Sequence, residues 1–182
     1  MCRFGLGVVL SLMLGTALAE AASTPATDAG LVILVRHAEK QPDVSDPPLS
    51  EAGQARALAL REALRDVRLA GVIVSDTRRT ALTADPVAKS QVIETIVVST
   101  KAGVAAHVAD AATQARKLAE NGAVLIVGHS NTLPAIVKAL GGPERPDLAE
   151  CAYSNLWVLH LRSDQSAGLI ESKYGAAEVG CP

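Results

Sequence analysis

Three short apolar runs divide the chain. Residues 31–35, 71–74 and 124–127 consist almost entirely of valine, isoleucine and leucine. Runs of this length and composition are typical of strands that are covered on both faces, as in a parallel sheet. We therefore expect these three runs to form the centre of the fold.

Helical patterns fill the intervals between the runs. Ser50 and Gln54 approximate the start signal of one helix, and a second is expected after Asp76. A third is expected from about Val104 to Ala119. Its apolar residues share one face: Val108, Ala111, Ala115 and Leu118. The alternation predicts an α/β fold, a three-layer sandwich with a mostly parallel central sheet and helices on both faces.

Three further strands are expected outside the central runs. Residues 92–98 and 155–161 have strand-like composition. Residues 168–174 carry Glu171 and Lys173, which suit an exposed edge strand.

The first residues of the chain resemble a signal peptide. Arg3 provides a positive start, residues 4–18 form an apolar stretch, and Ala17-Leu18-Ala19 fits a cleavage site. The stretch is shorter than the roughly 20 residues that a spanning helix needs, and glycines interrupt it. We expect cleavage after Ala19, with Ala22 as second choice, and retention as a membrane anchor as the alternative.

The expected domain organisation follows from this start. Residues 1–19 form the signal peptide, residues 20–30 a flexible lead-in, and residues 31–182 a single domain whose apolar content suffices for one core. The mature protein is expected to be periplasmic or secreted, with no stable membrane insertion after cleavage. The oligomeric state remains open.

Charge and aromatic content argue against a nucleic-acid partner. Cleavage removes only Arg3 from the 17 basic residues and none of the 19 acidic ones, so the net charge changes from −2 to −3. The only aromatic residues that remain are Tyr153, Trp157 and Tyr174. The chain thus has neither a global basic charge nor enough rings for base stacking.

Polar, reactive residues follow each central run. Arg36 and His37 follow the first, residues 75–79 the second, and His129 the third. Ligands of α/β sheets bind outside the carboxyl ends of the strands, so these groups are expected to meet at one edge. The proline-rich segment 41–48 directly follows His37 and is placed to rim that site.

The arginines after the second run favour an anionic ligand. If Ser75 or Asp76 caps the next helix, Arg78 and Arg79 lie in its first turn, where the helix dipole disfavours cations. A phosphoryl group would compensate, because helix N–H groups and guanidinium forks both match its geometry. The alternative is that both arginines pair with surface acids.

Four segments carry a resemblance to a known family. Residues 36–40 read Arg-His-Ala-Glu-Lys, residues 49–55 read Leu-Ser-Glu-Ala-Gly-Gln-Ala, residues 75–84 contain Ser75, Arg79 and Thr83-Ala84, and residues 127–129 read Val-Gly-His. In order and spacing they resemble the motifs of the histidine phosphatase (phosphoglycerate mutase-like) superfamily, with Ala38 replacing the usual glycine of Arg-His-Gly. The resemblance points to a small exported phosphatase branch.

The resemblance implies a phosphomonoester hydrolase with a phosphohistidine intermediate. His37 would be the nucleophile, and Arg36, Arg79 and His129 would bind the phosphate of a small phosphorylated substrate. Lys40 stands where some branches have a further phosphate-binding cation, although a solvated loop lysine is an equal alternative. No cofactor and no metal are expected, because arginines can supply the positive charge.

The proton donor for the leaving group stays unassigned. Ser130 stands where the acid-phosphatase branch has an aspartate, and a hydroxyl is too weak an acid. The mutase-like branch has a glutamate near the position of His107, with Asp110 one turn further. His107, Asp110 and Glu39 are therefore the candidates, although a histidine on a mostly apolar helix, as His107 is, is more often a structural residue.

Three rival functions remain. A serine hydrolase using Ser130 lacks the Gly-x-Ser-x-Gly pattern, because Thr132 replaces the second glycine. A zinc site of His37, His107 and His129 lacks metal-site spacing. The serious alternative is a non-catalytic module of the same fold that binds phosphate or a phospho-ligand.

Cys151 and Cys181 are an even pair once Cys2 leaves with the signal peptide. In an oxidising compartment we expect them to form a disulfide, worth about 3.5 kcal/mol in the chain-entropy model. Two free thiols are the alternative. Because the cysteines lie outside the motifs, the bridge is expected to affect thermal stability more than turnover.

Overall fold

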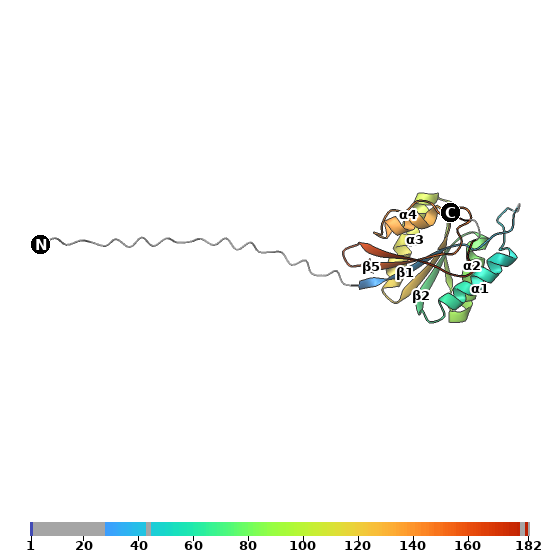
Figure 1. Ribbon diagram of the computed structural model, residues 1–182, viewed down its shortest axis with the longest axis horizontal. Coiled ribbons are helices and arrows are strands. Elements are labelled where there is room, and N and C mark those ends of the chain that lie inside the picture. Colours follow the sequence, from blue (N-terminus) through green and yellow to red (C-terminus); the bar gives the residue numbers. More distant parts are fainter. Residues whose placement is uncertain (2–27, 43–44, 179–180, 182) are drawn as a thin grey trace.

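The computed structural model describes Met1, residues 28–42, residues 45–178 and Cys181 (Figure 1). The expected cleavage site and most of the lead-in, residues 20–27, lie outside the described residues. The first strand begins at Asp28, earlier than the expected start at residue 31, because its pairing with a neighbouring strand continues past Gly30.

The described residues form ten elements, in which strands and helices alternate up to the final pair of strands. They are β1 (Asp28–Arg36), α1 (Glu51–Ala63), β2 (Leu69–Ser75), α2 (Arg78–Gln91), β3 (Thr95–Val98), α3 (Val104–Ala119), β4 (Ala123–Gly128), α4 (Thr132–Ala139), β5 (Asn155–Arg162) and β6 (Ala167–Lys173). None of the described helices is long and apolar enough to span a membrane.

The six strands form one mixed sheet in the order β3-β2-β4-β1-β5-β6. The first four of these are parallel to their neighbours, whereas β5 pairs antiparallel with both β1 and β6. The expectation of a mostly parallel sheet is thus corrected to a mixed one. The reason lies in the chain path, since β5 and β6 are joined by a tight hairpin, which can link only antiparallel strands.

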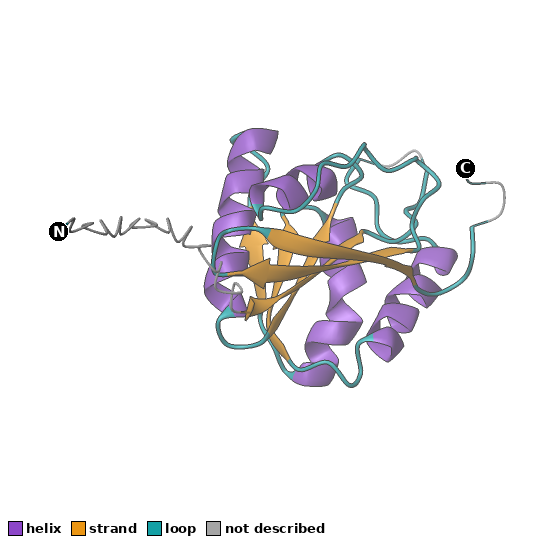
Figure 2. Cartoon of the chain, turned by 60° about the vertical axis from the view of Figure 1, so that its left-hand side comes forward, coloured by secondary structure: helices purple, strands orange, loops and turns teal. Residues whose placement is uncertain are grey.

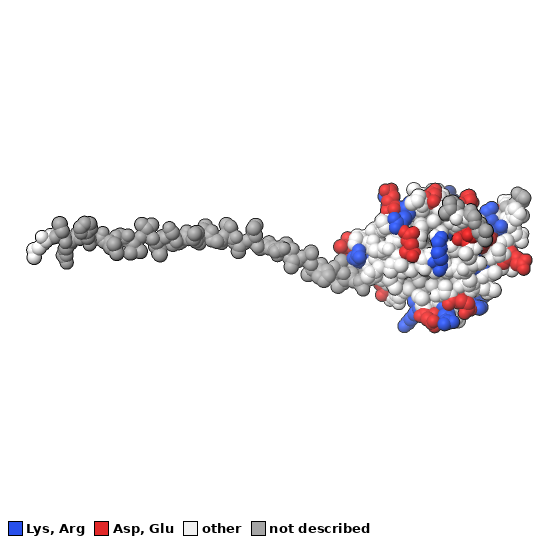
Figure 3. Space-filling model, in the orientation of Figure 1, with Lys and Arg blue, Asp and Glu red and all other residues white. Residues whose placement is uncertain are grey.

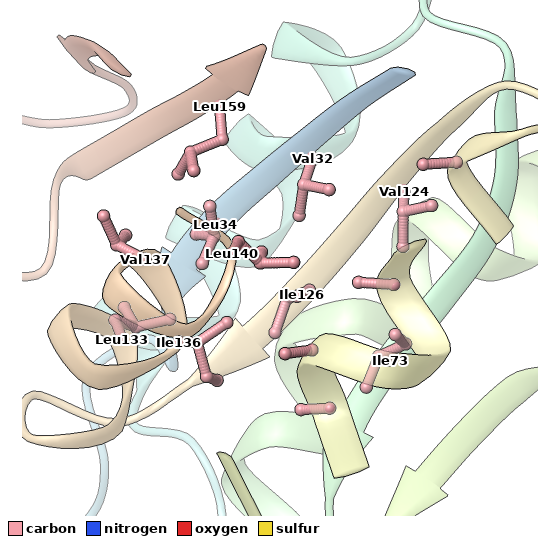
Figure 4. Close-up of a cluster of buried hydrophobic side chains, with 14 of the residues drawn as sticks. Val32, Leu34, Ile73, Val124, Ile126, Leu133, Ile136, Val137, Leu140 and Leu159 are labelled. Atoms are coloured by element: carbon pink, nitrogen blue, oxygen red, sulfur yellow. The ribbon is translucent and has the colours of Figure 1, made fainter. Parts of the chain in front are cut away.

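Alternate side chains of β1 enter two separate cores. Val32 and Leu34 pack with α3 and α4, together with Leu133 and Ile136 (Figure 4). Ile33 and Val35 belong instead to the cluster that includes side chains of α1 and α2. Because neighbouring strand residues point to opposite faces, the two pairs of helices lie on opposite sides of the sheet (Figure 2).

Helix starts agree with the sequence in one case and differ in another. Ser50 caps α1 by accepting a hydrogen bond from the Gly53 N–H. The N-cap of α2 is Thr77 and not Ser75 or Asp76, but Arg78 and Arg79 do lie in the first turn of this helix, as expected. The Asp76 carboxylate instead accepts hydrogen bonds from Ser99 and Thr100 after β3.

The strand expected at residues 92–98 is shorter, because β3 begins at Thr95. Val92 has a left-handed backbone (φ 54°) and forms the C-cap of α2. Its backbone N–H donates to the carbonyl oxygens of Ala88 and Lys89 at the end of that helix, so the residue belongs to the turn and not to the sheet.

Candidate active site

The central strands bring the four main candidates together. β1 and β4 run side by side, with Arg36 opposite Gly128, and β2 flanks β4 on its other side. The residues that follow these strands therefore meet at the carboxyl edge. The rings of His37 and His129 lie 5.4 Å apart, centroid to centroid.

The His37 ring is held in one tautomer. Its Nδ1 lies 2.8 Å from the Ala38 carbonyl oxygen, which can only accept, so Nδ1 carries the proton and Nε2 has the free lone pair. The side chain is buried, and its backbone N–H donates to Gly128. Burial, with smaller contributions from His129 and the two arginines, lowers the pKa of His37 to about 3. The free protein thus presents a neutral imidazole.

Arg36 is buried against the segment that precedes β5. Its NH1 group donates to the carbonyl oxygens of Ala149 (2.8 Å) and Glu150 (2.9 Å), and NH2 lies 3.3 Å from the Glu150 carboxylate. The guanidinium stacks over Tyr153 at 4.3 Å from the ring centroid. Its Nε is buried and has no hydrogen-bond partner among the described residues.

Arg79 and His129 are joined by a hydrogen bond. Arg79 NH2 lies 3.3 Å from His129 Nδ1 and must be the donor, so the imidazole proton is on Nε2 and is donated to the Ser75 hydroxyl at 2.9 Å. Burial, followed by the charge of Arg79, lowers the pKa of His129 to about 4. Arg79 Nε is a second buried donor without a partner in the described part of the chain.

The neighbouring Arg78 is exposed, and only its backbone takes part in the site's framework. Its N–H donates to Asp46 of the proline-rich segment at 3.0 Å. Asp46 also lies 3.9 Å from Arg79 NH1. Asp46 of this segment thus lies next to Arg79, and Asp46, not Asp76, binds the start of α2.

Thr83 ties the His37 segment to α2. Its hydroxyl donates to the Arg79 carbonyl oxygen (2.7 Å) and accepts from the Ala38 N–H (2.9 Å). Gly53 allows α1 to approach the same segment, because a Cβ there would lie 2.1 Å from the Glu39 carbonyl oxygen. Both residues belong to the quoted motifs and position the loop after β1.

The three candidate proton donors occupy different environments. Glu39 forms an ion pair with the buried Arg56, which contacts both of its carboxylate oxygens at 2.8–3.0 Å. His107 is buried on α3 and bonds through Nδ1 to the Val98 carbonyl oxygen. Asp110 is exposed on the same helix. None of the three forms a hydrogen bond with His37 among the described residues. His107 alone acts on the group formed by the histidines and arginines, because its charge contributes to the lowered pKa of His129.

Lys40 is exposed, and its backbone pairs with Leu49. Its ammonium forms no ion pair with any described residue. Within the described part of the chain, the Ser130 hydroxyl makes no hydrogen bond to His37 or His129. The backbone carbonyl oxygen of Ser130 accepts a hydrogen bond from the Leu148 N–H. Among the described residues, no three His, Cys, Asp or Glu side chains are grouped so that they could hold a metal ion.

Comparison with known proteins adds sequence and fold evidence. Residues 32–102 match the sequence profile of the histidine phosphatase superfamily, branch 1. This segment includes Arg36, His37 and Arg79, whereas His129 lies beyond it. No curated protein matches the chain in sequence.

Solved structures share the fold. The protein histidine phosphatase SixA, solved with tungstate, has a TM-score of 0.62 at 18% identity, over 79% of this chain and 96% of SixA. Mycobacterial glucosyl-3-phosphoglycerate phosphatase gives 0.61 at 14% identity, over 81% and 99% of the two chains. A vanadate (VO3) complex of the latter gives 0.59 at 16% identity, over 81% and 100%. The chain therefore has the fold of these phosphatases.

Sequence reasoning missed three residues at the site. Tyr153, Glu150 and Asp46 all contact Arg36 or Arg79. A usable signal existed for Tyr153, because an antiparallel β5 next to β1 starts at the same edge at which β1 ends. The Asp-Pro-Pro sequence in the rim segment was the only signal for Asp46.

Proposed function

We propose that this chain belongs to the histidine phosphatase superfamily and hydrolyses phosphomonoesters through a phosphohistidine on His37. Arg36, Arg79 and His129 bind the phosphoryl oxygens. The profile match and the shared fold support the coarse assignment. The roles of the individual residues rest on the geometry of the site.

One observation carries this proposal. A neutral imidazole with a free Nε2 lies in a site that also holds two guanidinium groups, each with a buried Nε–H that has no partner among the described residues. A buried donor without an acceptor costs free energy, so such donors call for an explanation. An anion between them, held next to a nucleophile, is the simplest one.

The proposed reaction has two steps. The His37 Nε2 lone pair attacks phosphorus, an N–P bond forms, and the P–O bond to the leaving group breaks with its electron pair on that oxygen, which takes up a proton. Water then attacks the phosphohistidine, loses a proton and releases inorganic phosphate, while the N–P bond electrons return to Nε2. The arginines stabilise the charge on the equatorial oxygens in both steps.

His129 acts as a neutral hydrogen-bond donor or acceptor in this scheme. Its lowered pKa and its bond from Arg79 keep it uncharged before substrate binds. A bound dianion favours a positive charge on His129, so the pKa of His129 rises in the complex, while His37 reacts as the neutral imidazole. We propose that the arginines supply enough positive charge for turnover without a metal or other cofactor.

The proton donor is the incomplete part of the scheme. The carboxylates nearest the arginines are Glu150 and Asp46, both exposed at the rim. We propose that the leaving-group proton comes from this rim or from water, and not from Glu39, His107 or Asp110. We propose that the exposed Lys40 ammonium attracts the anionic substrate from solvent but does not contact the bound phosphate.

The names of the structural neighbours support a phosphorylated substrate, and we propose that it is a small one. The neighbours are described as acting on protein phosphohistidine or glucosyl-3-phosphoglycerate, and their structures include tungstate and vanadate complexes. On the face seen in Figure 3, acidic and basic side chains are interspersed. We propose that nucleic acid is not a partner. We also propose that residues 1–19 direct export to the periplasm or the exterior and that residues 31–182 act as one domain.

A non-catalytic phosphate-binding module is the second candidate. It is favoured by the fact that none of the three expected proton donors forms a hydrogen bond with His37 among the described residues. Both candidates bind oxyanions, so binding alone does not separate them. Steady release of phosphate from p-nitrophenyl phosphate by the mature protein, lost in His37→Ala, supports the enzyme. Stoichiometric vanadate binding without turnover across pH 4–9 contradicts it and supports the module.

A further inference from the structure

The segment that holds Arg36 is itself held by the end of the chain. We call residues 149–154 the clamp segment, because Ala149 and Glu150 accept hydrogen bonds from Arg36 and Tyr153 stacks on it. The Tyr153 ring also lies 6.0 Å from the His37 ring, centroid to centroid. The clamp segment has no helix or strand that would fix it in place.

The C-terminal tail, residues 175–178 and Cys181, provides two anchors for the clamp segment. Glu178 accepts from the backbone N–H groups of Tyr153 and Ser154 with one carboxylate oxygen, and from the Ser154 hydroxyl with the other. Cys181 forms a disulfide with Cys151, with the Cα atoms 5.6 Å apart. The expected disulfide is thus present, and it starts at the residue directly after Glu150.

A third contact ties the tail to the body of the protein. Arg56 on α1 donates to the carbonyl oxygens of Tyr174 (3.1 Å) and Ala176 (3.1 Å) while it holds Glu39. Arg56 is only 5% exposed, so it is a fixed point from which the tail extends toward the clamp segment. The path runs from α1 through the tail and the clamp segment to Arg36.

We propose that Glu178 is a positioning residue for phosphate binding, which acts with the Cys151–Cys181 disulfide through the clamp segment to orient Arg36. This inference rests on the proposed function, because it takes Arg36 to be a phosphate ligand. Glu178 bonds to Tyr153 and Ser154 and, among the described contacts, to none of the proposed phosphate-binding residues. Its effect therefore passes through the backbone of these two residues to the two carbonyl oxygens that hold Arg36.

The chemistry of Glu178 suits this role. Partial burial opposes its ionisation, but hydrogen bonds from Ser154 and Tyr153 lower the pKa of the carboxyl below its usual value. The group is therefore an anion that accepts three hydrogen bonds from two adjacent residues. Charge-assisted bonds of this kind are stronger than neutral ones, which makes the carboxylate an effective anchor for a loop.

The location of the disulfide changes the expectation for its removal. Although it lies outside the motifs in sequence, it adjoins the residues that hold Arg36 in space. Reduction by a dithiol, which is oxidised to its own disulfide while Cys151 and Cys181 become thiols, frees the tail at this anchor. We expect phosphate affinity to fall in addition to thermal stability.

The test uses the mature, oxidised protein with vanadate as the probe. Vanadate affinity is measured by calorimetry, and KM and kcat with p-nitrophenyl phosphate, in the parent, Glu178→Gln, Glu178→Ala, and the double variant Cys151→Ser with Cys181→Ser. The matched control is Glu62→Ala, which removes an exposed carboxylate paired with Arg61 on α1. Circular dichroism fixes a temperature at which every variant is folded.

The expected result is about tenfold weaker vanadate binding and higher KM in Glu178→Ala, with a smaller change in kcat. Glu178→Gln retains an oxygen for the two N–H groups and should be intermediate, and the disulfide variant should behave like Glu178→Ala. If the folded parent binds vanadate but all three variants match Glu62→Ala within twofold, the role of Glu178 and the bridge is refuted while the proposed function stands. If the parent itself neither binds vanadate nor turns over, the proposed function fails first. Should Glu178→Ala not fold, the Gln variant and dithiol reduction of the parent decide by the same comparison.

Discussion

The catalytic edge and the C-terminal tail contribute to one site in different ways. The catalytic edge consists of Arg36 at the end of β1, His37 and His129 directly after β1 and β4, and Arg79 in the first turn of the helix after β2, so the register of the parallel strands brings these segments together. The tail reaches the same site from the far end of the chain through side-chain and disulfide contacts. The reactive groups therefore lie in or next to strands and helices in the sequence. The orientation of Arg36, in contrast, depends on the clamp segment and the tail, which have no regular secondary structure.

Removal of the nucleophile should produce the largest effect at the catalytic edge. His37→Ala is expected to lower kcat by more than about a thousandfold, because no other described nucleophile occupies its place. Vanadate binding through the arginines should persist in weaker form. Steady-state assays and circular dichroism of the variant check both statements, and substantial turnover by a folded His37→Ala protein would remove the basis of the mechanism.

Substitution of the two adjacent arginines, Arg78 and Arg79, should lower kcat/KM to very different extents. Arg79→Ala is expected to cost about 3 kcal/mol of transition-state stabilisation, roughly a hundredfold in kcat/KM, as for a lost oxyanion contact. Arg78→Ala should change little, since its side chain is exposed. The comparison of kcat/KM for the two variants with p-nitrophenyl phosphate is the measurement. Equal losses would mean that Arg78 also binds phosphate in the complex.

Thr83 tests how the loop after β1 is held. Thr83→Val leaves the buried Ala38 N–H without an acceptor and should destabilise the fold by about 1–3 kcal/mol. Thr113→Val is the matched control, because Thr113 makes the same helix bond to the residue four positions earlier but is exposed. Denaturant unfolding of both variants measures the difference. A similar, small loss in both would show that the Thr83 hydroxyl does not anchor this loop.

The histidines should give the free protein a distinct response to acid. His37 and His129 have pKa values of about 3 and 4, below the ordinary value of 6.5. Between these values the unfolded chain binds more protons than the folded one, so the free energy of unfolding should fall as the pH falls from about 6.5 toward 4. The slope approaches about 1.4 kcal/mol per pH unit for each histidine.

Denaturant unfolding from pH 7 to 4.5 measures this slope, and imidazole NMR signals of His37 and His129 follow the protonation. His37→Ala should reduce the slope by about half if the histidines dominate it. Titration of either imidazole near pH 6.5 in the free protein would contradict the burial of these groups.

Chelation should produce the smallest effect. Excess EDTA is expected to leave turnover unchanged, because Arg36 and Arg79 supply the charge that a metal would provide, while vanadate should inhibit. Assays before and after dialysis against chelator make the comparison. Loss of activity in EDTA and its recovery with zinc would favour a metal-dependent reaction.

Local signals made much of the fold and the catalytic edge predictable. The apolar runs of β1 (Val32 to Val35), β2 and β4 predict buried strands, and Ser50 predicts the start of α1. The positions of Arg36, His37 and His129 follow from the ends of those strands. Such features depend on neighbours in sequence, which is why a single chain reveals them.

Long-range contacts could not be predicted in the same way. The Asp76 carboxylate binds Ser99 and Thr100. Asp46, from a different loop, binds the start of α2. Glu39 pairs with Arg56 on a helix, and nothing in the local sequence distinguishes this from a free acid. These choices depend on which polar groups the folded chain brings within hydrogen-bond distance.

The central claim is that His37 becomes phosphorylated. The most direct test mixes the mature protein with a labelled phosphomonoester, quenches within milliseconds into alkali, where phosphohistidine survives, and maps the label by mass spectrometry. We expect up to one phosphoryl group per chain on His37, lost on brief acid treatment and absent from His37→Ala. A parent protein that turns over substrate while the label is absent from His37, or lies on another residue, would contradict the mechanism.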